Sequence, residues 1–159
     1  MNITDKIYAE KVLKHLFIGA QLDGVQFGMS PATIKVYFTH YKDVVDYGGQ
    51  LYLTIESKWC LFDKRPMKFP KSAEEIEHYS EEEEYRRIFQ CRRQKVINIE
   101  LAENTPHLLI TLENGYELFV NGVHDMYECW QAGVEFDEET WLIVATPGND
   151  IAIWAPERF

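Results

Sequence analysis

The sequence lacks the motifs of the common nucleotide, hydrolase and metal sites. It contains no GxGxxG, no GxxxxGK[ST] and no GxSxG, so neither nucleotide binding nor serine hydrolysis has sequence support. The histidines form no HExxH and no other closely spaced ligand pair; they are His15, His40, His78, His107 and His124. The sequence therefore predicts no metal site, no cofactor and no catalytic residue.

Cysteine and long apolar runs are also scarce. Cys60, Cys91 and Cys129 lie far apart with no CxxC spacing, which excludes a disulfide framework and indicates buried, reduced thiols in a cytoplasmic protein. No apolar run approaches the length of a membrane helix. The residues from Met1 to Lys6 do not resemble a signal peptide. We expect neither membrane insertion nor export.

Basic residues are few relative to acidic ones. Sixteen Lys and Arg stand against 26 Asp and Glu, for a formal charge of −10. This balance argues against binding to nucleic acid or to anionic lipid and would attract a basic protein partner. The hydrophobic fraction of 46% is typical of a globular chain, and the length of 159 residues predicts a single domain over residues 1–159.

The apolar periodicity predicts a helix followed by strands in the first part of the chain. Apolar residues recur at helical spacing from Ile7 to Phe17, with an N-cap at Thr4-Asp5 and a stop at Gly19. The period then changes to two. We expect strands over 21–27 and 34–38 with a turn at Met29-Ser30-Pro31, and a further strand pair over 51–62.

A helical segment over residues 72–93 separates this strand-rich part, 21–64, from a second one. Ser72 and Glu75 have the spacing of a capping box, which predicts a helix from that point, either one long element or two short ones interrupted at Tyr79-Ser80. Glu81 to Glu84 are all acidic and arginines follow them, an order that suits the helix dipole. The apolar stripe is thin, so we expect a surface helix with one packed edge.

The second strand-rich part covers residues 95–155. Strands are expected over 96–101, 108–113 and 116–120, and Asn114-Gly115 predicts a type I′ hairpin between the last two. A final hairpin is expected from 140–146 and 151–154 around residues 147–150. The fold class is therefore α+β, a mainly antiparallel sheet of about seven to nine strands with an N-terminal helix and a central acidic helical segment.

The two strand-rich parts resemble each other, in either of two registers. Residues 51–62 match 108–119, and a competing alignment matches 25–38 with 99–112. Both cannot hold. Coincidence between period-two segments is the alternative to a true internal repeat of two similar halves.

The candidate binding residues lie in the acidic segment. Glu81, Glu82, Glu83 and Glu84 would steer a basic partner, and Tyr79 and Tyr85 would supply apolar contact. A solvated helix face is the alternative for the acidic run. His124 and Cys129 are close enough in sequence for a catalytic dyad, but the segment is acidic, and acidic neighbours raise rather than lower the pKa of a thiol.

The strand-turn pattern from Leu108 to Val120, with the ending from Trp141 to Trp154, resembles small uncharacterised bacterial α+β proteins, some of which resemble immunity proteins of toxin systems. The resemblance assigns no role to any residue. It implies a cytosolic, non-catalytic protein-binding domain, such as an immunity-type inhibitor of a basic toxin. The alternative is a small-molecule or peptide binding domain with a pocket between sheet and helix. An enzyme without a familiar motif is the third hypothesis.

Overall fold

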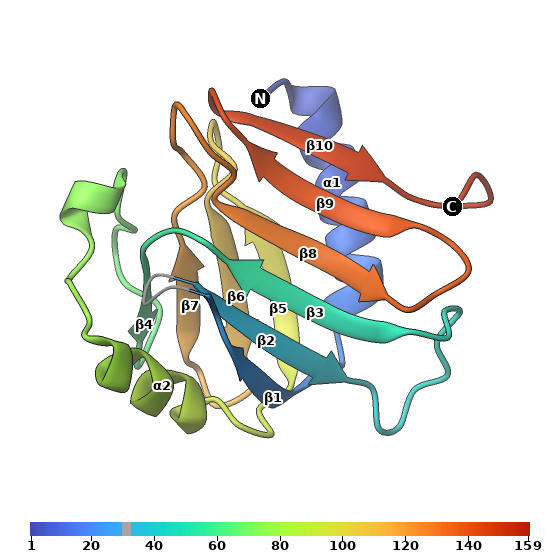
Figure 1. Ribbon diagram of the computed structural model, residues 1–159, viewed down its shortest axis with the longest axis horizontal. Helices are drawn as coiled ribbons and strands as arrows, with labels where there is room; N and C mark the ends of the chain where they lie inside the picture. The colour runs from blue at the N-terminus through green and yellow to red at the C-terminus, as the bar shows by residue number, and fades with distance from the viewer. Residues whose placement is uncertain (30–32) are drawn as a thin grey trace.

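The computed structural model describes residues 1–29 and 33–159 and has an α+β architecture with two antiparallel sheets (Figure 1). The six-stranded sheet has the order β1-β2-β3-β8-β9-β10, and the four-stranded sheet has the order β4-β7-β6-β5. The six-stranded sheet contains β1 (Gln21–Phe27), β2 (Ile34–Thr39), β3 (Gln50–Ile55), β8 (Trp130–Glu135), β9 (Trp141–Thr146) and β10 (Asp150–Trp154). The four-stranded sheet contains β4 (Trp59–Phe62), β5 (Val96–Leu101), β6 (Leu108–Leu112) and β7 (Glu117–Val120). The helical elements are α1 (Ile3–Phe17), the 3-10 turn η1 (Ala73–Glu75) and α2 (Glu81–Gln90).

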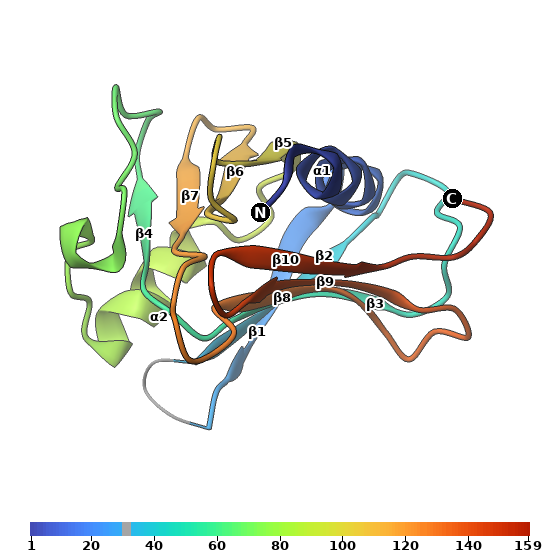
Figure 2. The same ribbon diagram turned by 90° about the horizontal axis from the view of Figure 1, so that it is seen from above.

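Helix α1 lies in the angle between the two sheets (Figure 2). Its buried residues recur at helical spacing and contribute to the core; they are Ala9, Val12, Leu13, Leu16 and Phe17. The predicted N-cap at Thr4-Asp5 is wrong by two residues, because the side chain of Asn2 accepts the hydrogen bond from the Asp5 N–H. The predicted helix is otherwise confirmed, and Gly19 follows its end with φ +92°.

The described residues contain ten strands, one more than the largest number expected. The strand that the sequence did not indicate is β8, whose centre is Ala132-Gly133, and such small residues weaken the strand pattern. The two strands expected over residues 51–62 are present as β3 and β4, but the expectation that they form a pair is wrong. Strand β3 pairs with β8, and β4 crosses to the other sheet and pairs with β7.

Two predicted hairpins are confirmed, β6–β7 and β9–β10. The turn type of the first differs from the prediction, because φ is positive at Gly115 but not at Asn114. The Gly115 N–H donates to the Leu112 carbonyl, so the turn is type I followed by a left-handed glycine. The expected turn at Met29-Ser30-Pro31 includes residues outside the described ranges.

The two sheets are joined by main-chain hydrogen bonds between the start of β1 and the start of β5. The N–H groups of Gly19 and Leu22 donate to the carbonyls of Val96 and Gln94 at 2.9 and 3.1 Å. In return, the N–H groups of Arg93 and Val96 donate to the carbonyls of Leu22 and Ala20 at 2.7 and 2.8 Å. We call these four bonds the sheet junction. Both residues at its ends, Gly19 and Arg93, have positive φ, +92° and +67°.

The hairpins on either side of the junction have the same register. Val25 pairs with Val36 as Ile99 pairs with Ile110, and a bulge follows Leu22 as one follows Val96. These pairs match the second of the two sequence alignments. The division into two halves is not confirmed, because residues 21–64 and 95–155 each supply strands to both sheets.

We predict opposite effects of substitution at the two ends of the sheet junction. Gly19→Ala should lower the free energy of unfolding by about 1–2 kcal/mol, since a side chain is strained at positive φ. Arg93→Gly should be neutral or stabilising by up to about 1 kcal/mol, because it relieves that strain. Urea unfolding measures both. Gly115→Ala is the control, with φ +93° and open space around the added Cβ, and it should cost a similar amount.

Candidate functional site

The N-cap of helix α2 is Ser80, whose hydroxyl accepts a hydrogen bond from the Glu83 N–H at 3.2 Å. The predicted capping box at Ser72 is wrong, because Ser72 precedes only the short turn η1 and makes no side-chain cap hydrogen bond. The four glutamates occupy the first turn of α2, where their charge favours the helix dipole. Only Ile88 of the helix is buried, which agrees with the expected single packed edge.

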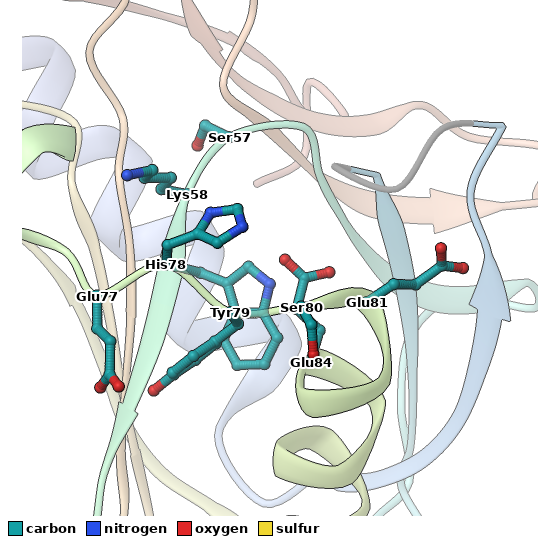
Figure 3. A pocket seen from close by; sticks show the side chains of 9 residues that line it. Ser57, Lys58, Glu77, His78, Tyr79, Ser80, Glu81 and Glu84 are labelled. Atoms are coloured by element: carbon teal, nitrogen blue, oxygen red, sulfur yellow. The ribbon is translucent and has the colours of Figure 1, made fainter.

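A cavity of about 290 Å³ lies at the N-terminal end of α2 (Figure 3). We call it the α2 cavity. Three short segments form it: the β3–β4 connection, the residues before α2, and the first turn of α2. Its lining consists of Ser57, Lys58, Trp59, Glu77, His78, Tyr79, Ser80, Glu81 and Glu84. None of these segments lies close to the others in sequence except the last two, so only the fold assembles the cavity.

Two aromatic side chains form the inner wall of the α2 cavity. Trp59 and Tyr79 are buried, with a ring separation of 5.5 Å in an edge-to-face arrangement. The Tyr79 hydroxyl accepts a hydrogen bond from the Leu61 N–H at 3.3 Å, which fixes its ring. The indole N–H of Trp59 is buried and has no acceptor among the described residues. An unpaired buried donor is costly, and the indole N–H of Trp141 is in the same state among the described residues.

The carboxylates of Glu81 and Glu84, which line the α2 cavity, differ from that of Glu83 in their ion pairing. Glu83 forms an ion pair with Arg87 at 3.3 Å. Within residues 1–29 and 33–159, neither Glu81 nor Glu84 is within ion-pair distance of a cation. The third carboxylate of the cavity lining, that of Glu77, is directed away from Glu81 (Figure 3). Burial raises the pKa of Glu84 to about 7, and the negative charge of Glu81 contributes.

A second hollow of about 290 Å³ lies between β1 and α2. We call it the β1–α2 groove. Its lining is mostly apolar and consists of Leu22, Asp23, Gly24, Val25, Tyr85, Ile88, Phe89 and Arg92. Val25 and Phe89 are 43% and 68% exposed, and Phe27 beside them is 74% exposed. The ring centroids of Phe27 and Tyr85 lie 4.6 Å apart, so the exposed rings form one patch with the groove.

The bulge after Leu22 explains why these apolar side chains gather in the groove. It places Leu22, Val25 and Phe27 opposite Phe38, Val36 and Ile34, three residues whose side chains are buried. Val25 and Phe27 therefore lie on the core-facing side of the sheet. Both side chains are nevertheless exposed, beside the groove that separates this part of β1 from α2.

The structure divides the six predicted binding residues between different surroundings. Glu81, Glu84 and Tyr79 line the α2 cavity, although Tyr79 is 7% exposed and belongs to its wall. Tyr85 lines the β1–α2 groove. Glu82 is exposed, and Glu83 is held by Arg87; neither lines the cavity.

Sequence reasoning missed several residues of the two sites, notably Lys58, His78, Val25 and Phe89. No local signal marks Lys58 or His78, because each is a single polar residue that only the fold brings to the cavity. Val25 and Phe89 read as ordinary core residues of a strand and a helix. Their exposure depends on where the core ends, which period alone does not give.

The three cysteines are buried, and His124 of the candidate dyad stacks on a tyrosine. Cys60, Cys91 and Cys129 are free and buried, as expected, and burial raises the pKa of all three thiols. His124 stacks on Tyr127 with ring centroids 3.6 Å apart. Among the described residues no group of three or more His, Cys, Asp or Glu is placed to hold a metal ion.

Comparison with known proteins gives no family assignment. No family model, no curated protein and no solved structure matches the chain. Among the described residues no helix is both long and apolar enough to cross a membrane.

We predict that Glu84→Gln stabilises the fold in a pH-dependent way. The folded-state pKa of Glu84 is raised, so the wild type loses stability as pH rises from the ordinary glutamate value of 4.5 through about 7. The amide avoids this loss, and the gain should reach about 1 kcal/mol above pH 7 after allowance for partial exposure.

Urea unfolding between pH 4 and pH 8 measures this effect. Glu82→Gln is the matched control, since it removes the same charge from the same turn at an exposed position. A gain for Glu84→Gln that does not grow with pH would contradict the assignment of an ionised, partly buried carboxylate.

Proposed function

We propose that the chain is a protein-binding domain that holds a basic partner on the face formed by α2 and β1. The observation that carries this proposal is the patch of exposed rings around the β1–α2 groove, next to the unpaired carboxylates of the α2 cavity. Both hollows use one side of α2, because Glu81 and Glu84 line the first and Tyr85, Ile88 and Phe89 line the second.

The apolar part of this face supports an interface role. Exposed apolar side chains are common when they are single, but a contiguous group rimmed by polar residues marks an interaction site. Phe27 and Phe89 would be the anchors, since exposed aromatic residues near a pocket contribute most to binding energy. Tyr85 supports Phe27 by ring contact and so presents it.

The charge of the chain supports a basic partner. The formal charge of −10 produces a field that steers cationic proteins, and Glu81 and Glu82 are exposed at the N-terminal end of α2. Arg92, just after the end of α2, lines the β1–α2 groove and makes that end of the face cationic. A partner with the opposite pattern would bind in a single orientation. An immunity-type inhibitor that occludes a basic toxin is one protein with this role.

A small-molecule or peptide ligand is the second candidate, favoured by the apolar lining of the β1–α2 groove between sheet and helix. A catalytic use of the α2 cavity has less support. The Ser57 hydroxyl donates to the Asn121 carbonyl at 2.6 Å and is therefore not hydrogen-bonded to His78 as a nucleophile would be to its base.

We predict that the double variant Phe27→Ser, Phe89→Ser weakens partner binding at least about tenfold and leaves the fold intact. Both rings are mostly exposed, so their loss removes contact area rather than core packing. The measurement is affinity capture from lysate of the source organism, followed by a dissociation constant for the recovered partner. Ile7→Gln is the control, because Ile7 is 62% exposed on α1. Equal binding by wild type and double variant would remove this face from the proposal.

We predict that changing Glu81, Glu82, Glu83 and Glu84 together to Gln lowers the association rate with that partner by roughly tenfold at low salt. The reason is loss of electrostatic steering, so the difference should shrink as salt rises. Stopped-flow or surface-based kinetics at several salt concentrations measure it, with thermal unfolding as the check on folding. Unchanged, salt-dependent association in the variant would exclude these glutamates from the interface.

A further inference from the structure

We propose that the α2 cavity receives one arginine side chain of the partner, with its guanidinium facing Glu81 and Glu84 and its stem along Trp59 and Tyr79. This inference rests on the proposed function and specifies the group that the domain recognises.

The size and shape of the cavity favour a single side chain. Its volume of about 290 Å³ is at the lower limit of pockets that hold a drug-sized ligand. Its wall is aromatic, and its rim carries carboxylates from one turn of a helix. An arginine matches both, because its guanidinium is planar, stacks on aromatic rings and pairs with carboxylate oxygens.

The chain already contains one arginine that lies against Tyr79 and pairs with a glutamate of α2. The guanidinium of Arg87 lies 5.3 Å from the centre of the Tyr79 ring and pairs with Glu83 at 3.3 Å. The α2 cavity presents similar groups, Tyr79 with Glu81 and Glu84, but no arginine among the described residues occupies that position. A cation from outside would complete the second arrangement.

The aromatic wall favours a guanidinium over a metal ion or a polyamine, because a planar guanidinium stacks on aromatic rings while its N–H groups pair with carboxylate oxygens. Lys58 and His78 oppose a cation, and they lie on the opposite side of the view from Glu81 (Figure 3). They restrict the guanidinium to the α2 side.

Binding should depend on pH because the cation favours ionised Glu84. The other charged or titratable groups that line the cavity with Glu84 are Glu81 on α2, Lys58 on the β3–β4 connection, and Glu77, His78 and Tyr79 before the helix. Affinity should rise with pH through about 7, the pKa of the free site. His78→Gln removes the one histidine among these groups, and the rise with pH should persist in this variant.

The test is an NMR titration with the blocked peptide acetyl-Gly-Arg-Gly-amide and with its citrulline counterpart, which has the same shape and no charge. The arginine peptide should shift the Trp59 indole and the amides of residues 57–59 and 77–84, and citrulline should bind at least about tenfold more weakly. Glu84→Gln should weaken arginine binding about fivefold or more, and Glu82→Gln should leave it unchanged.

Equal binding of the two peptides, shifts confined to the β1–α2 groove, or equal effects of Glu84→Gln and Glu82→Gln would each overturn the inference. The proposed function would then still stand or fall by the Phe27 and Phe89 variants. Those side chains do not line the α2 cavity, so the two failures are distinguishable.

Discussion

The sheet junction is the constraint on which the rest of the structure depends. Four main-chain hydrogen bonds hold the start of β1 against the start of β5, and they require positive φ at Gly19 and Arg93. Because the bonds are made by the backbone at the edges of two sheets, they fix the angle between the sheets independently of side-chain size. Helix α1 then fills that angle with its apolar stripe, and the core closes around it (Figure 2).

The same constraint creates the candidate interface. Beyond the junction, β1 diverges from the four-stranded sheet (Figure 2), and its core-facing residues Val25 and Phe27 are exposed. Helix α2 covers them in part through Tyr85 and leaves the β1–α2 groove. The crossing of the chain from β3 to β4 brings Trp59 under the N-terminal end of the helix, where it forms the wall of the α2 cavity. Both hollows are therefore consequences of how two sheets diverge, with one short helix between them.

The sequence predicted those elements whose turn residues or apolar period lie within one short segment of the chain. The final hairpins and α1 were predicted because a turn dipeptide or a helical period lies within one segment. The pairing of β3 with β8 was not predicted, since partners distant in sequence are selected by the whole core and β8 is weakened by Ala132-Gly133. At the site, the sequence indicated the glutamates of α2. It could not separate Glu84, unpaired in the cavity, from Glu83, paired with Arg87.

That difference between adjacent glutamates is the strongest physical reason to assign a role to the cavity. An ionised carboxylate that is partly buried and unpaired costs stability, and a glutamine or a hydrophobic residue at Glu84 would avoid the cost. The chain pairs other carboxylates where it can, including the buried Glu117, which Arg65 and Thr111 hold. A ligand that supplies a cation to this cavity offsets the cost at Glu84, whereas packing alone does not explain why the carboxylate is kept there.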